Sequence, residues 1–419
     1  MRIFIQGVLL CLTFAFSLRA QSDGLHQIQD ELTQFLLRQQ TRGFLPEAFL
    51  NHQPISVYDA RKALVEIEKH KQKLSQTDQS LLDFYLHKKQ DPTANWAQKK
   101  ISFLYKNKHD FVSTIGDGYD VQLNPIAYIG AGPGLFEEAG KDNSQKTVWR
   151  RTLGIRASGH IGKGVFFETR ISGNVEQAPY PDTDGHPPRH ARSLHYQAFG
   201  GRTDNYDYFD ATGIVGYHSK HFEVRFGRDN NRWADGMNSV LLSNYPAKYD
   251  QLQLRTTLGK RAQYVNLFAA FDDYYRPKLA NGMIPRRFAA FHELTLRIAE
   301  RLDVSVFESI VFSRPSETGK ELYNFELTYL NPIIFYRSVE RDRGSPDNAL
   351  VGAQASWQTR KNIRLYGQII LDEFTFEEIK AQNGYWANKY AGLLGFHWAG
   401  RQKTDVRIEA GSARPFLYS

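Results

Sequence analysis

The stretch Val165-Phe166-Phe167-Glu168-Thr169-Arg170-Ile171-Ser172-Gly173-Asn174-Val175-Glu176 alternates apolar and polar side chains along its length. Apart from Phe166 and Thr169, the even-numbered positions are polar and the odd-numbered positions are not. Because successive residues of a β-strand point to opposite faces of the sheet, this strand has one apolar face and one charged face. The strands of a membrane-spanning β-barrel with a wet interior need that pattern.

The same period returns in residues 363–371 and in Asp405-Val406-Arg407-Ile408-Glu409. Together with shorter examples it predicts strands at roughly 120–129, 148–161, 164–177, 208–218, 221–228, 250–258, 262–272, 287–299, 302–313, 348–358, 362–372, 388–399 and 403–417. Short turns and long connections alternate between these strands, as in bacterial outer-membrane barrels with short periplasmic turns and long outer loops. The predicted fold class is therefore an antiparallel, all-β transmembrane barrel of the outer-membrane type with a small N-terminal helical segment.

The composition of the chain excludes membrane-spanning helices. Mean hydropathy is −0.50, and beyond the N-terminus no run of about 18 apolar residues could form a spanning helix. Residues 1–20 have the basic start, apolar core and small final residue of a secretory signal peptide. The chain's one cysteine, Cys11, lies inside that segment. We therefore expect a secreted mature chain without disulfides.

Residues 21–95 have a helical pattern instead. Two capping boxes, Ser56 with Asp59 and Ser75 with Asp78, mark helix starts. This segment precedes the first expected strand, so it should lie on the side of the short turns. We expect a periplasmic helical bundle that caps or plugs the mouth of the barrel, and assign residues 96–419 to the barrel itself.

The expected strands are odd in number, which would leave Ser419 on the outer side and an unpaired sheet edge in lipid. The 314–347 connection has strand-like patterns at 322–329 and 333–339, but a further pair leaves the number odd. We expect either a miscounted strand or a chain that stops short of a closed barrel.

Several long connections mix aromatic and charged residues. Aromatic faces stack on sugar rings, and Arg and Asp side chains bind hydroxyl and carboxylate groups, so these connections suit an anionic polysaccharide. An aromatic girdle at the membrane interface is an equal alternative. The candidate polysaccharide-binding residues are Arg228, Asp229, Arg232, Trp233, Tyr274, Arg276, Arg286, Arg287, Tyr385 and Trp386.

Other chemistry is weakly indicated. The histidines at 186, 190 and 195 match no defined metal-site spacing, and the glycine-rich 130–134 run has no following helix to bind a dinucleotide. The acidic pair Asp372-Glu373 is what a strand end entering water carries. We expect no metal, no cofactor and no enzymatic activity. Charged residues on the polar strand faces should pair across strands: Arg156, Glu168, Arg170, Glu223, Arg225, Arg255, Glu293, Arg297, Arg407 and Glu409.

The chain resembles the capsule-assembly Wzi family of outer-membrane proteins, including its relatives in gliding bacteria. The residues that carry the resemblance are Gly227-Arg228-Asp229 with Trp233, Gly236 and 241–244; Phe291-His292-Glu293-Leu294; Leu330-Asn331-Pro332; 348–352; and 366–368 with 371–374. The resemblance implies a small periplasmic helical bundle below an 18-stranded barrel and a non-enzymatic lectin that assembles or holds capsular polysaccharide. This chain departs from the family by ending earlier.

The leading functional expectation is an outer-membrane protein that binds capsular or extracellular polysaccharide. A diffusion porin is the alternative that the charged interior favours and the helical segment opposes. A surface adhesion or gliding-motility component is a further alternative. The expected partners are polysaccharide, outer-membrane lipid and the barrel-insertion machinery, with no nucleic acid.

Overall fold

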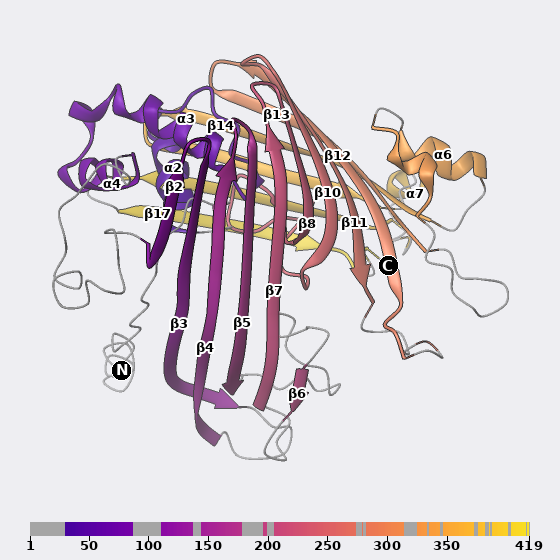
Figure 1. Cartoon of the computed structure of the whole chain (residues 1–419). Helices are drawn as coiled ribbons and strands as arrows, with labels where there is room; N and C mark the ends of the chain where they lie inside the picture. The colour runs from indigo at the N-terminus through magenta and orange to yellow at the C-terminus, as the bar shows by residue number, and fades with distance from the viewer. Residues whose placement is uncertain are drawn as a thin grey trace. The chain divides into compact units, whose positions relative to one another are not determined.

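The structure is a computed structural model (Figure 1). It describes residues 30–86, 110–136, 144–177, 196–198, 205–273, 279, 282–313, 325–332, 335–343, 347–372, 376–381, 385, 388–400, 404–415 and 417–418. These residues fall into two compact units. The first comprises residues 91–214 with 1–24 and 245–247, and the second comprises residues 25–90, 215–244 and 248–419. The predicted signal peptide, residues 1–20, lies outside the described residues.

The first unit is an antiparallel sheet in the order β2-β3-β4-β5-β7, with β6 paired to β7. Its strands are β2 (Val112–Gly116), β3 (Tyr119–Phe136), β4 (Ser144–Ile161), β5 (Val165–Gln177), β6 (Tyr196–Ala198) and β7 (Asn205–His218). Strand β7 continues past Ile214 into the residues of the second unit.

The two faces of the first sheet have the polarity that its sequence predicts. Ile171 on β5 and Leu153 on β4 are exposed, whereas Asn174 and Glu168 are buried. The buried groups bind one another across strands: Arg156 Nη2 lies 2.8 Å from Glu168 Oε2, and Thr152 Oγ1 donates to Asn174 Oδ1 at 2.8 Å. A water-soluble sheet would bury the apolar side instead.

The second unit contains an antiparallel sheet in the order β8-β10-β11-β12-β13-β14-β15-β16-β17. Its strands are β8 (Phe222–Asp229), β10 (Tyr249–Leu258), β11 (Ala262–Asp272), β12 (Arg286–Ala299), β13 (Leu302–Phe312), β14 (Asn348–Arg360), β15 (Ile363–Leu371), β16 (Tyr390–Ala399) and β17 (Asp405–Ala413). Two of its short turns place a residue in the left-handed backbone region, Gly259 (φ 64°) and Asn362 (φ 67°). Gly and Asn adopt this conformation with the least strain.

We call the two sides of this sheet the covered face and the bare face. On β15, Leu365 is 40% exposed on the bare face, whereas Gln368 is 7% exposed on the covered face. The bare face presents apolar side chains: Phe226, Leu258, Leu296, Ile298, Val306, Trp357, Leu365, Ile369 and Leu394. The covered face carries buried Glu, Arg, Gln and Ser side chains together with apolar ones, so its polarity is again the reverse of a water-soluble sheet.

Helices α2 (Glu31–Thr41), α3 (Val57–Glu68) and α4 (Gln76–Leu86) belong to the second unit. Both predicted capping boxes are confirmed. The amide of Asp59 donates to Ser56 Oγ at 3.2 Å, and the amide of Asp78 donates to Ser75 Oγ at 3.2 Å. Asp30 caps α2 in the same way, with Thr33 N donating to its carboxylate at 2.6 Å. The helices share a core of leucines, isoleucines and Phe35.

The predicted antiparallel β-architecture is confirmed, and each expected strand is present, most of them with small shifts at their ends. Strand β3 extends further, through the glycine-rich 130–134 run that was expected to lie in a connection. Among the described residues, none of the helices is both long and apolar enough to cross a membrane. Strand β2 was not expected, and with it the described antiparallel series has an even number of strands. Within the described residues, a miscounted strand therefore accounts for the odd number.

The strand-like patterns within the 314–347 connection are wrong as strands. The described part of that connection contains the 3-10 helix η4 (Leu327–Leu330) and helix α6 (Tyr336–Arg343). Asn331-Pro332 separates the two, because proline cannot continue a hydrogen-bonded element. The apparent alternation comes from aromatic side chains that pack on one side only, against strands β11 to β13.

Candidate functional site

Two distant stretches of the second unit lie together on the covered face. Strand β1 (His52–Gln53) pairs with β9 (Arg232–Trp233), which lies in the connection between β8 and β10. We call residues 230–244 of that connection the inner loop. Its Ala234 N donates to Asn51 O at 2.8 Å, and Trp233 N donates to Leu242 O at 2.9 Å. Residues 30–86 and the inner loop together form what we call the cover.

Trp233 is the apolar anchor of the cover. Its side chain is 0% exposed. Its ring meets Phe291 and Phe307 edge-on, with centroid distances of 6.3 and 6.0 Å, an arrangement that aromatic pairs prefer. A cluster of buried residues from β10 to β16 surrounds it. The inner loop is therefore a packed element on the sheet.

Glu293 is the polar anchor. It lies on β12, is 0% exposed, and is bound from both sides of the interface. Asn51 Nδ2 donates to its carboxylate at 3.0 Å, Gln354 Nε2 donates at 2.7 Å, and His52 Nε2 lies 3.3 Å away. A buried carboxylate needs such partners because its desolvation is costly.

A buried ionic cluster attaches the start of helix α3 to the sheet. Glu223 accepts from Arg225 Nε and Arg255 Nη2, each at 2.7 Å. Arg225 Nη1 also donates to Pro54 O at 2.7 Å, and Arg255 forms an ion pair with Asp59 of α3. These contacts make the two arginines bridges between the covered face and the cover.

Tyr58 extends the same contact. Its ring stacks on His218 with centroids 4.4 Å apart. Burial raises the pKa of Tyr58 above its ordinary value, and the negative charge of Glu223 acts in the same direction. The phenol therefore stays neutral at physiological pH.

The residues of the cover before β2 contact the short-turn end of these strands. Arg38 of α2 donates to Gly400 O at 2.6 Å and to Thr404 O at 3.1 Å, on the two sides of the β16–β17 turn. Glu47 pairs with Lys260 of the β10–β11 turn at 2.8 Å. Helical residues were expected on the side of the short turns, and these contacts place them there.

The tip of the inner loop is held by Glu409 of β17. This carboxylate accepts from Met237 N at 2.6 Å, from Asn238 Nδ2 at 2.7 Å and from Tyr366 OH at 2.6 Å. Beside it, Arg364 Nη2 lies 2.8 Å from Asp235 Oδ1. The loop is thus fixed at its base by Trp233 and at its tip by charged groups of β15 and β17.

A second charged group lies at the opposite, long-connection end of the strands. Arg228 lies 3.2 Å from Asp250 and 3.3 Å from Asp272, and Arg286 lies 3.3 and 3.1 Å from the same two carboxylates. We call these four residues the rim cluster. They come from β8, β10, β11 and β12, and the strand register places them on the bare-face side. All but Asp272 are partly exposed.

The candidate residues from the sequence separate into four groups. Arg228 and Arg286 meet in the rim cluster, and Arg287 pairs with Asp273 next to it at 2.7 Å. Asp229 accepts from Asn230 N at 2.9 Å at the end of β8, and Tyr385 is exposed. Arg232 and Trp233 are buried in the cover, and Arg232 donates to Gln53 Oε1 at 2.9 Å. Tyr274, Arg276 and Trp386 lie outside the described residues.

Arg232 and Trp233 have no surface available for a glycan in this conformation, because the cover encloses both side chains. No local sequence pattern indicates that burial, since their neighbours Asn51, His52 and Gln53 are far away in the chain. Sequence reasoning also missed Asp250 and Asp272. Their signal was present: each ends or begins a strand opposite an arginine in the antiparallel register.

Part of the expected pairing across strands is present, as in Arg156 with Glu168, Arg255 with Glu223, and Arg297 with Asp303 at 2.8 Å. Arg407 instead donates to Gln34 Oε1 of α2 at 2.6 Å. The expectation that Asp372 meets water at a strand end is wrong: Asp372 is buried and accepts from Tyr418 N at 3.1 Å, while Glu373 lies outside the described residues.

A small recess lies between the cover and the sheet, and it has no room for a molecule of the size of water. The residues that line it include Asn51, Asp235, Asp303, Gln354 and Arg364. The recess is too small for an oligosaccharide. Within the described residues, no group of three or more His, Cys, Asp or Glu side chains is arranged to hold a metal ion, and the histidines at 186, 190 and 195 lie outside that part of the chain.

Comparisons with known proteins give remote likenesses only. No protein-family model matches the chain, and no curated protein matches it. Among solved structures it is similar to Wzi, an outer-membrane protein involved in group 1 capsule assembly in Escherichia coli and a carbohydrate-binding β-barrel, with 10% identity, TM-score 0.34, and coverage of 93% of this chain and 95% of that chain.

Two further similar structures are outer-membrane proteins of other kinds. The siderophore receptor PiuA from Acinetobacter baumannii has 8% identity and TM-score 0.30, with 71% of this chain and 49% of that chain covered. OccK8 (OprE) from Pseudomonas aeruginosa has 10% identity and TM-score 0.28, with 67% and 79% covered. The chain thus spans about half the length of the siderophore receptor. Similarity at this level establishes neither a family nor a ligand.

Proposed function

We propose that this protein is a non-enzymatic outer-membrane β-barrel that holds surface polysaccharide at its long-connection end. The reversed polarity of both sheets supports the membrane part of this proposal. Apolar side chains such as Leu153, Leu365 and Leu394 are exposed, while carboxylates and amides are buried on the other side. Lipid is the medium in which exposing the apolar face is favourable. The short turns and the helices of the cover then lie on the periplasmic side.

The sealed covered face favours a binding role over the porin alternative. A porin lumen is water-filled, so polar wall residues should be wet. Along β8 to β15 the wall residues Arg225, Glu293 and Gln354 are instead buried and bonded to the cover. Several of these contacts are charge-assisted, which makes them stronger than neutral hydrogen bonds.

The rim cluster is the observation that carries the polysaccharide part. It presents arginine and aspartate groups together, on the bare-face side, at the end of the strands where the long connections begin. The charges of the arginines and aspartates in the rim cluster balance. The cluster therefore suits both the hydroxyl groups and the carboxylate groups of a glycan as ligands. A glycan chain lying along the outer leaflet would meet the cluster at that level.

Binding and conductance together test this proposal. The refolded full-length protein is applied to acidic and neutral bacterial polysaccharides on a glycan array, and is also inserted into a planar bilayer. We expect retention of at least one polysaccharide and no steady open current. Arg286→Ala, which leaves Asp272 with Arg228 only, should weaken retention.

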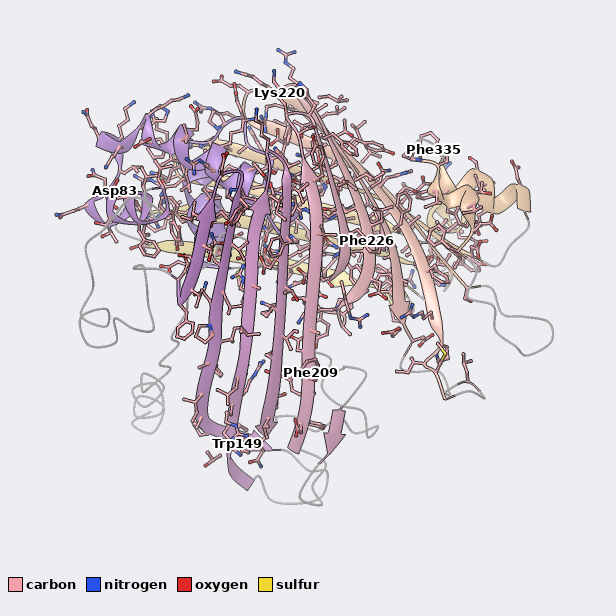
Figure 2. The ribbon with its side chains drawn as sticks, in the orientation of Figure 1. Asp83, Trp149, Phe209, Lys220, Phe226 and Phe335 are labelled. Carbon is pink, nitrogen blue, oxygen red and sulfur yellow. The ribbon has the colours of Figure 1, made fainter. Side chains whose placement is uncertain are left out.

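The matched control is Lys220→Ala, which removes an exposed cation from the short turn before β8 (Figure 2). It should leave retention unchanged because it lies at the other end of the strands. A large steady current without glycan retention would replace this proposal with the porin. Retention that is equal in wild type and Arg286→Ala would move the binding site away from the rim cluster.

A further inference from the structure

A row of polar side chains interrupts the bare face of the second unit. The strand register places Asn266 of β11, His292 of β12 and Glu308 of β13 side by side. His292 Nε2 lies 2.9 Å from Glu308 Oε2. The row is six residues along β12 from Arg286, or about 20 Å at the usual strand rise. It therefore lies well inside the apolar band, where a charged pair in contact with lipid would be costly.

The described part of the 314–347 connection covers this row. We call residues 325–332 and 335–343 the strap. Its backbone contacts two members of the row: Asn266 Nδ2 donates to Pro332 O at 3.3 Å, and Tyr336 N donates to Glu308 Oε2 at 3.0 Å. Tyr264 OH also donates to Pro332 O. The Tyr336 ring stacks on His292 with centroids 4.5 Å apart.

Aromatic packing attaches the strap to the apolar part of the same face. Phe325 meets Phe288 and Phe312 at centroid distances of 5.6 and 5.1 Å, and Tyr329 meets Phe312 at 5.0 Å. Tyr329 OH donates to Asp347 at 2.7 Å, just before β14. The strap is thus bound to the sheet over β11 to β14, where Figure 1 shows α6 in orange.

The other side of the strap exposes apolar side chains together with the polar Asn331, Ser338 and Asp342. Leu327 is 74% exposed and Phe335 is 70% exposed, and Leu330 is also exposed. Figure 2 labels Phe335 at the start of α6. These residues are continuous with the bare face, because the strand register places exposed Val351 of β14 directly beside Glu308.

We propose that Leu327, Leu330 and Phe335 of the strap are embedded in the outer leaflet and contact lipid hydrocarbon there. This inference rests on the proposed membrane function. The strap binds the polar row through its backbone and aromatic rings on one side, and presents these three apolar side chains on the other. A long connection, ordinarily expected in water above the membrane, is here part of the lipid-facing wall.

Spin-label accessibility tests the proposal. The label is attached at Leu327→Cys or Phe335→Cys in a chain whose Cys11 is replaced by serine, and the protein is refolded into phosphatidylcholine and phosphatidylglycerol vesicles. Leu394→Cys on the bare face is the lipid reference, and Asp83→Cys on exposed α4 is the water reference. Collisions with oxygen report lipid, and collisions with a water-soluble nickel complex report water.

We expect the oxygen-to-nickel ratio at both strap positions to match that at Leu394→Cys. A strap ratio that matches Asp83→Cys, while Leu394→Cys still reports lipid, would overturn the strap inference and leave the membrane proposal standing. A Leu394→Cys label that reports water would overturn both. Strap labels shielded from both reagents would mean that a protein partner, not lipid, covers the strap.

Discussion

At the scale of single residues, the sequence predicted which side chains face inward but not what they bind. The two-residue period placed Glu293, Glu223 and Arg255 on the polar side of their strands. Their partners come from residues 51–59, far away in the chain, and strand periodicity carries no information about such contacts. Burial of Trp233 was unpredictable for the same reason, since a tryptophan among charged residues also fits an exposed binding loop.

Removing the Glu293 carboxylate should destabilise the protein strongly. Glu293→Ala leaves Asn51 and Gln354 without their acceptor and His52 without its charge partner, which should cost about 3–5 kcal/mol. Glu293→Gln keeps one acceptor oxygen and should cost about 1–3 kcal/mol. Urea unfolding from lipid vesicles measures both changes.

Glu300→Ala is the control for this series, because Glu300 is exposed in the short turn after the same strand. Its effect should stay within about 0.5 kcal/mol. Equal effects of the Ala substitutions at 293 and 300 would contradict the assignment of Glu293 as the polar anchor of the cover.

At the scale of elements, local sequence patterns predicted the structure correctly where neighbouring residues alone determine it. Hydroxyl and carboxylate at fixed spacing identified the starts of α3 and α4, since a capping box needs only four neighbouring residues. Strand β2 was not predicted because it is short and its residues, such as the exposed Ile115, do not alternate regularly between apolar and polar. The strap was mistaken for strands because its aromatic spacing suits both, and only packing on β11 to β13 decides between them.

Trp233→Ala should loosen the inner loop. The loss of a fully buried aromatic side chain costs about 3–5 kcal/mol when the cavity cannot collapse, and here β1, β9 and the β12 and β13 phenylalanines all lose contact with it. Trypsin cleavage at Arg232 should become faster in the folded protein, as followed by mass spectrometry.

Trp357→Ala is the matched control, because Trp357 is exposed on the bare face of β14. It removes the same side chain without opening a cavity beneath the cover. Cleavage at Arg232 should then remain at the wild-type rate. A Trp233→Ala protein that resists trypsin as wild type does would show that the inner loop is held without its apolar anchor.

At the scale of the whole molecule, fold class followed from one property, the period of two, which recurs in both units and survives errors at individual strand ends. The candidate binding surface could not be predicted from the same period. The rim cluster depends on the register between four strands, and Trp233, one of the aromatic candidates, lies in the cover. The same property that predicted the fold also yields the most general test of it, because contact with lipid and burial under the cover must alternate along a strand that has the bare face on one side.

A bimane scan of residues 363–371 on β15 should show that alternation. Bimane on Leu365→Cys and Ile369→Cys should be quenched by brominated lipid and not by aqueous iodide, because these positions lie on the exposed apolar side. Positions 364, 366, 368 and 370 face the buried side and should respond to neither quencher. If iodide quenches the label at Leu365 and Ile369 while brominated lipid does not, the bare face lies in water, and the lipid assignment of both the sheet and the strap is wrong.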